Sequence, residues 1–90
     1  MSEEPSVTQR LREQAFNRHR AIGEVVQWFE PGKLEGLPRT VSQRCAELAS
    51  DMLTLIPVDD PELTRGLSAL VQVRNHFVRA AIVAQREDGQ

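Results

Sequence analysis

The sequence is poor in the residues that small proteins use for covalent or metal crosslinks. Its single cysteine, Cys45, excludes an intrachain disulfide, and it lies on the apolar stripe of an expected helix, which predicts a small buried hydrophobe. The only histidines, His19 and His76, are not spaced as in a zinc site. A chain of 90 residues buries only a modest core alone. We therefore expect no metal or other cofactor, and we expect a homo-oligomer.

Charge excess, long hydrophobic runs and strand patterns are also missing. The net charge of −2 gives no general attraction to nucleic acid. No apolar run approaches the length of a membrane span, and the acidic segment Met1–Pro5 is not a signal peptide, so we expect a cytoplasmic protein with no membrane partner. No segment alternates with period two. These absences predict an all-α fold.

The apolar residues that are present recur at helical spacing in three segments. We expect helices over Val7–Phe29, over Pro38–Ile56, and from Asp59 or Asp60 to about Arg86. Asp59 and Glu62 fit a capping box, with Pro61 in the first turn. Residues 1–5 and 87–90 are expected to be frayed termini of a single domain spanning residues 1–90.

The second and third helices carry apolar seams that predict a long antiparallel hairpin, with the first helix packed across it. The seam of the second helix is Val41, Cys45, Leu48, Met52 and Leu55. The third helix has one stripe of Leu63, Leu67, Leu70, Phe77 and Ala81 and another of Val71, Val78 and Ile82. We expect Leu48, Met52, Leu67 and Leu70 among the most buried residues, and Val71, Val78 and Ile82 near an inter-chain or first-helix contact.

Basic residues at two places in the chain each have more than one interpretation. Arg10, Arg12, Arg18 and Arg20 form either a solvated helix face or a phosphate-binding one. Mid-helix Arg74 either snorkels, pairs with Glu47 or Asp51, or lines an interface.

Trp28, Phe29, Lys33 and Arg39 cluster around the first connector. They are suited to a stacked base beside a phosphate, or else Phe29 closes the core and Trp28 covers it. The chain has no glycine-rich phosphate loop, no paired-carboxylate motif and no positioned nucleophile, so an enzyme is the least expected class.

A family resemblance adds to this interpretation over roughly residues 26–82. It is carried by Trp28-Phe29, Leu37-Pro38, Val41-Ser42, Leu48-Ala49, Pro57, Glu62-Leu63, Leu67, Leu70 and Val78-Arg79-Ala80-Ala81. This pattern resembles the helical-hairpin domain of phage anti-CBASS and anti-Thoeris proteins, and more closely the branch found in phages of actinobacteria.

The resemblance implies a non-enzymatic sponge, typically hexameric, that binds cyclic nucleotide immune signals between protomers and blocks host anti-phage signalling. Carried over, the stacking aromatic is Phe29 or Trp28 and the first-connector cation is Lys33 or Arg39. The family places an arginine directly before the glutamate that matches Glu62. This chain has Pro61 there, and Arg65, one turn further, is the candidate substitute.

Two other functions remain open from the residues alone. One is a protein–protein interaction module that docks through the exposed stripe of the hairpin and has no small-molecule ligand. The other is a nucleic-acid-associated protein that uses the arginines of the first helix. No specific DNA or RNA partner is expected, because no short recognition helix follows the first connector.

Overall fold

The computed structural model describes residues 6–88, and every regular element in that range is helical. The elements are α1 (Val7–Ala15), α2 (Arg20–Val26), the short 3₁₀ helix η1 (Gln27–Phe29), α3 (Leu37–Leu55) and α4 (Pro61–Asp88). The expected all-α class is therefore confirmed for the described residues. The expected fraying of residues 1–5, 89 and 90 lies outside them, whereas α4 extends through 87 and 88, where fraying was wrongly predicted.

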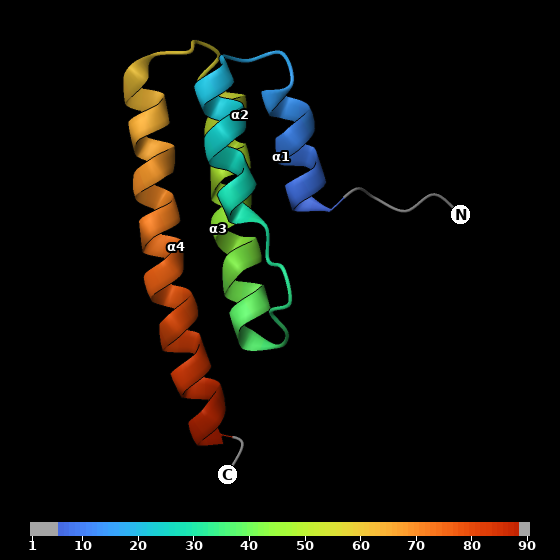
Figure 1. The fold of residues 1–90 in the computed structure, drawn as a ribbon, viewed down its shortest axis with the longest axis vertical. Helices are drawn as coiled ribbons and strands as arrows, with labels where there is room; N and C mark the ends of the chain where they lie inside the picture. Colours follow the sequence, from blue (N-terminus) through green and yellow to red (C-terminus); the bar gives the residue numbers. More distant parts are fainter. Residues whose placement is uncertain (1–5, 89–90) are drawn as a thin grey trace, which may run out of the picture.

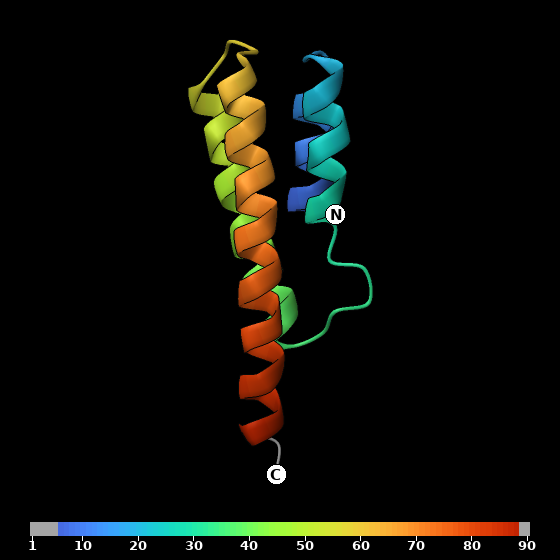
Figure 2. The same cartoon turned by 60° about the vertical axis from the view of Figure 1, so that its left-hand side comes forward.

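The helices form two layers. The long helices α3 and α4 run side by side in opposite directions, and the shorter α1 and α2 pack over one face of that pair (Figures 1 and 2). At 1.5 Å per residue, α4 with 28 residues is about 42 Å long and α3 with 19 residues is about 28 Å long. The C-terminal turns of α4 therefore project beyond α3 (Figure 1).

The predicted single helix over residues 7–29 is wrong, because the chain reverses at residues 16–19. Ala15 ends α1, and the His19 Nδ1 atom accepts a hydrogen bond of 3.0 Å from the Ala21 N–H to cap the start of α2. Ile22 follows Ala15 by seven positions with only the exposed Phe16 between them as a large apolar residue. The apolar stripe thus has a gap where the two helices separate.

The hydrophobic core lies between the two layers. Leu11, Ile22 and Phe29 from the N-terminal layer are 0% exposed, and Leu67 of α4 is 2% exposed. The face of α3 that meets this layer carries small residues, namely Ser42, Ala46, Ala49 and Ser50, with Leu53. Small side chains allow α1 and α2 to approach α3 closely.

The predicted burial of the hairpin seams is correct for Leu67 but wrong for Leu48, which is 46% exposed. Met52 and Leu70 are half-buried, as is Cys45, which was expected inside. The seam of α3 is turned toward α4 and solvent because the small-residue face of α3 is the one that α1 and α2 cover. Leu55 of the same seam and Phe77 of α4 are exposed as well.

The second stripe of α4 is mostly used within the chain. Val78 is buried, and Val71 packs against the core beside α2. Of the two predicted contacts for this stripe, inter-chain or with the first helix, Val71 makes the one with the first helix.

Side chains cap the starts of the two long helices. The start of α4 is capped by Asp60 rather than the predicted Asp59, since the Asp60 Oδ1 atom accepts a 2.8 Å hydrogen bond from the Glu62 N–H. At the start of α3, the Leu37 N–H donates to the Gln85 Oε1 atom of α4 at 2.8 Å. Gly36, which precedes α3, has a φ of 65°, a conformation that favours glycine.

Candidate functional site

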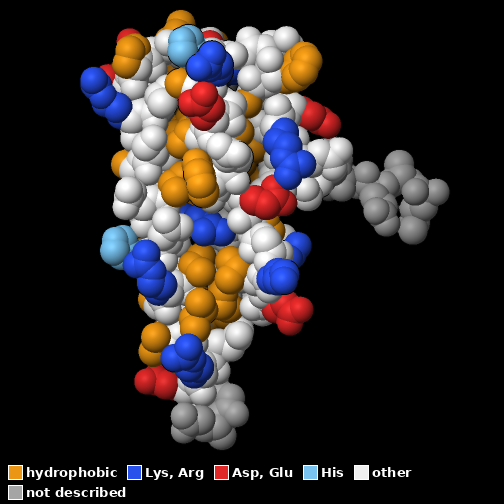
Figure 3. Space-filling view, in the orientation of Figure 1, with side chains coloured by type: hydrophobic (Ala, Val, Ile, Leu, Met, Phe, Trp, Pro, Cys, Tyr) orange, Lys and Arg blue, Asp and Glu red, His pale blue; other side chains and the backbone are white. Residues whose placement is uncertain are grey.

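A groove of about 460 Å³ runs between α2 and α4. Its α2 side is formed by Ala21, Glu24, Val25 and, in η1, Trp28. The Trp28 side chain is 63% exposed, so the indole stands beside the groove rather than within the core. Hydrophobic side chains form two groups along the middle of this face, with a Lys or Arg side chain between them, and most of the other charged side chains lie toward its edges (Figure 3).

The α4 side of the groove is largely neutral and polar. It consists of Thr64, Ser68, Val71, Gln72 and Asn75. Asn75 is oriented by its neighbour, because its Oδ1 atom accepts a 2.9 Å hydrogen bond from the Arg74 guanidinium. This wall offers hydroxyl and amide groups to a ligand.

A second hollow of about 320 Å³ continues the groove toward the α3–α4 turn. It shares Ala21 and Thr64 with the first hollow and adds His19, Asp59 and Arg65. Arg65 is exposed and forms an ion pair of 2.5 Å with Glu62, one turn earlier in α4. A pair this exposed contributes little to stability, so its guanidinium can exchange partners at small cost.

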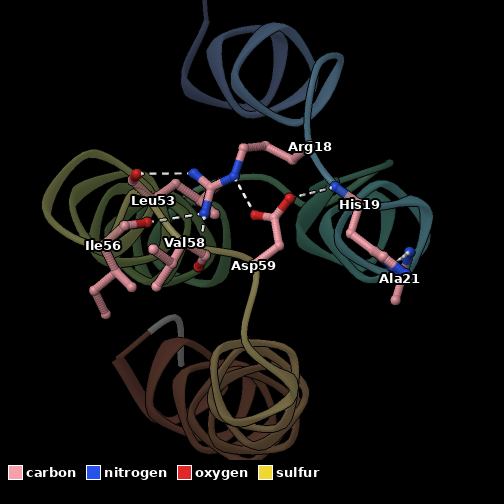
Figure 4. Close-up of polar contacts among 7 residues, drawn as sticks. All are labelled: Arg18, His19, Ala21, Leu53, Ile56, Val58 and Asp59. Carbon is pink, nitrogen blue, oxygen red and sulfur yellow. Dashed lines mark hydrogen bonds and ion pairs between the residues drawn. The ribbon is translucent and has the colours of Figure 1, made fainter.

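Beside this second hollow lies a polar cluster that the sequence did not reveal. The Arg18 guanidinium donates hydrogen bonds to the carbonyls of Leu53 (3.2 Å), Ile56 (2.8 Å) and Val58 (3.3 Å) at the end of α3. It also pairs with the Asp59 carboxylate, which accepts a 2.8 Å bond from the His19 N–H (Figure 4). Arg18 was expected either on a solvated helix face or on a phosphate-binding one, and neither is correct. The Arg18 side chain instead satisfies carbonyls at and just after the C-terminus of α3.

The charges of this cluster act on Asp59. Hydrogen bonds from the Arg18 guanidinium and from the His19 N–H hold the pKa of the Asp59 carboxyl below its ordinary value of 3.8. Asp59 therefore stays ionised near neutral pH.

Arg74 has a similar connecting role. Its Nε atom donates to the Ser42 hydroxyl of α3 at 3.1 Å, and its guanidinium donates to the Glu30 carbonyl at 3.0 Å, just after η1. Neither Glu47 nor Asp51 is its partner, so that predicted pairing is wrong. Arg74 instead joins α3, α4 and the end of η1.

The predicted ligand-binding residues are only partly brought together. Trp28 and Arg65 border the continuous groove between α2 and α4. Phe29 is 0% exposed and closes the core, so stacking by Phe29 is excluded in this fold. Lys33 lies in the connector before α3 and Arg39 in the first turn of α3, at the other end of that helix from the α3–α4 turn, and Arg39 donates to the Leu34 carbonyl at 3.2 Å.

On the face of the hairpin away from α1 and α2, a hollow of about 390 Å³ separates α3 and α4. Almost all of its lining is apolar, with Leu48, Met52, Leu70 and Val73 among the residues that form it. Phe77 and Leu55, exposed by 57% and 70%, extend the apolar surface along the two helices.

Residues 6–88 bring together no group of three His, Cys, Asp or Glu residues suited to a metal ion. None of the helices in that range combines the length and apolarity of a membrane span. Burial raises the pKa of the Cys45 thiol, against a smaller lowering by Arg74.

Comparison with known proteins returned no match, whether against family models, curated proteins or solved structures.

Proposed function

We propose that the protein is a non-catalytic binding protein that assembles as a homo-oligomer and sequesters a cyclic nucleotide signal, either a cyclic di- or trinucleotide or a cyclic ADP-ribose isomer. The observation that carries the proposal is Trp28, an exposed indole beside a groove of about 460 Å³. Nucleobases stack on such side chains, and the volume is in the range of small-molecule sites. The nucleotide class, the phage origin and action in the host cytoplasm come from the resemblance to the sponge family.

The distribution of cations supports a site shared between protomers. Arg65 is the one Lys or Arg among the described residues that line the second hollow, whereas Arg39 lies in the first turn of α3, far from the α3–α4 turn, and Lys33 lies in the connector before α3. A cyclic dinucleotide carries two phosphates, which call for charge-assisted contacts. A second protomer can bring its Lys33 and Arg39 to the groove, as the hexameric assembly implied by the resemblance would require.

The apolar face of the α3–α4 pair supports the proposed assembly. Val41, Cys45, Leu48, Met52 and Leu55 are spaced by alternating steps of four and three, the repeat of a helix-packing seam. The face is about 28 Å long, the length of α3, and two adjacent helices are roughly 20 Å wide. Its projected area of roughly 560 Å² is of the order of the ~800 Å² per partner in stable interfaces.

The test is a thermal-shift panel of cyclic dinucleotides, cyclic trinucleotides and cyclic ADP-ribose isomers on the purified oligomer. We expect a ligand to raise the melting temperature by mass action and to be recovered chemically intact. Trp28→Ala should weaken its binding by about 1–3 kcal/mol. Phe16→Ala is the matched control, because Phe16 is 85% exposed and lies away from the groove. A panel without any shift would contradict the proposal.

A protein–protein interaction module is the second candidate, favoured by the nearly all-apolar lining of the α3–α4 hollow. An amphipathic helix of another protein would fit between α3 and α4. In that case no cyclic nucleotide shifts the melting temperature, the purified chain is monomeric, and Phe77→Glu abolishes capture of an identified partner.

A further inference from the structure

The larger hollow of the groove between α2 and α4 offers no cation of its own to a phosphate. Among residues 6–88, Glu24 is the only charged residue that lines this hollow, and it is acidic. The other polar groups there are neutral hydroxyls and amides. A neutral, planar group with its own hydrogen-bond donors matches this lining, and a nucleobase stacked on Trp28 is such a group.

Glu24 and Trp28 lie one helical turn apart on the same wall. The Glu24 Oε1 atom accepts a 3.3 Å hydrogen bond from the Arg20 Nε atom, and its side chain is 64% exposed. An ionised carboxylate has about four lone-pair sites and can only accept. This wall therefore favours a base edge with N–H donors and disfavours one with lone pairs.

Asn75 on the opposite wall has its amide orientation settled by chemistry. Arginine can only donate, so the atom facing Arg74 at 2.9 Å must be the Asn75 oxygen. The Asn75 –NH₂ group is then the part of the amide left to donate to a ligand. That group favours a base edge with acceptor atoms.

We propose that the α2–α4 groove binds guanine, with Glu24 accepting from the N1–H and N2–H groups and Asn75 donating to O6 or N7. The inference rests on the proposed function, since it names the base of the sequestered nucleotide. Guanine presents donors on one side and the O6 and N7 acceptors on the other. Adenine would place its N1 lone pair against the Glu24 carboxylate.

The chain provides its own reporter for this site. Trp28 is the only tryptophan and the sequence has no tyrosine, so intrinsic fluorescence reports on the groove directly. The probes are cyclic di-GMP and cyclic di-AMP, which share a backbone, together with 5′-GMP and 5′-AMP, which test the base apart from the ring. We expect each guanine compound to quench Trp28 and to bind at least about tenfold more tightly than its adenine counterpart.

Glu24→Gln separates base recognition from general binding. It replaces a pure acceptor with an amide, so affinity for the guanine compounds should fall about tenfold while affinity for the adenine compounds stays within about twofold. Glu13→Gln on α1, outside the groove, is the control and should change neither. Melting temperatures of both variants verify that they are folded.

The outcomes distinguish this inference from the proposed function. Equal affinity for guanine and adenine compounds, or an equal effect of Glu24→Gln on both, overturns guanine recognition and leaves sequestration standing. Binding that shifts the melting temperature without changing Trp28 fluorescence does the same, because the ligand then lies elsewhere. Absence of binding by these four probes and by the whole thermal-shift panel overturns both.

Discussion

Arg18 and Asp59 form an ion pair across 41 positions of the sequence, and it joins the N-terminal helices to the turn of the hairpin. The same guanidinium holds three carbonyls at the end of α3. The Arg18 side chain is only 14% exposed, whereas the Arg20 side chain, two residues later, is 90% exposed. Arg18 and Arg20, although only two positions apart in the sequence, therefore have different structural roles.

Arg18→Met should destabilise the protein through its lost carbonyl contacts. Hydrogen bonds from a charged donor contribute about 1.5–3 kcal/mol each and are not additive, so we expect a loss of about 2–3 kcal/mol in the free energy of unfolding by urea. Arg20→Met is the matched control and should change it by less than about 0.5 kcal/mol. Equal effects of the two substitutions would show that the carbonyl contacts do not form in solution.

Acid should weaken the fold through Asp59. Its pKa is lower in the folded chain than in the unfolded one, so its contribution is fully present above the unfolded pKa of about 3.9 and is lost as the pH falls through the folded pKa. We therefore expect the melting temperature to drop as the pH is lowered below about 4. Asp59→Asn should lower it at neutral pH and reduce the slope of the acid limb. If the melting temperature of Asp59→Asn falls with acid as steeply as that of the wild type, other carboxyl groups cause the acid destabilisation.

Truncations of a buried and of an exposed leucine of the α3–α4 pair should differ in cost. Leu67 is 2% exposed and Leu48 is 46% exposed. Leu67→Ala should cost about 2–5 kcal/mol, and Leu48→Ala clearly less in the monomer, both measured by denaturant unfolding. A larger cost for Leu48→Ala at high protein concentration alone would place Leu48 in an interface between copies.

Assembly should depend on the exposed face of α3 and α4. We expect sedimentation velocity at micromolar concentration to show an oligomer, and Phe77→Glu to dissociate it into folded monomers because it places a charge in an apolar interface. Phe16→Glu is the control, since Phe16 is exposed on the α1–α2 turn, and it should leave the oligomer intact. Val78→Asp should unfold the chain instead, because Val78 is 7% exposed. A folded wild-type monomer at these concentrations would contradict the proposed assembly.

The long helices were predictable because their signals are local. Pro38 falls in the first turn of α3 and Pro57 follows its end, and apolar spacing continues through α4, so the expected bounds agree with the observed ones to within about two residues. Asp60 rather than Asp59 caps α4 because Asp59 is held by Arg18. The choice of capping residue therefore depends on Arg18, which is 41 positions from Asp59 in the sequence. A local capping pattern cannot predict it.

The N-terminal region was less predictable because its apolar residues fit two arrangements. Ala15 and Ile22 are seven positions apart, which suits one long helix as well as two short ones joined by a reversal. For the ligand-binding residues, the Trp28-Phe29 pair indicated one core residue and one exposed residue without saying which was which. The helix register settles this by burying Phe29 completely. No sequence motif marks Gln72 and Asn75 as part of a site. They line the groove only because α2 lies beside α4 in the fold.

The attachments at the two ends of α2–η1 have a consequence for how fast a ligand could enter. Seven residues are too few for a helix to persist alone, yet this segment is tied at its start by the Asp59 bond to the His19 N–H and at its end by the Arg74 bond to the Glu30 carbonyl. Its position is therefore imposed from α4 and the hairpin turn before any ligand arrives. A ligand would meet a wall that needs no ordering, so association should follow a single diffusional phase, with affinity differences between ligands appearing in their dissociation rates.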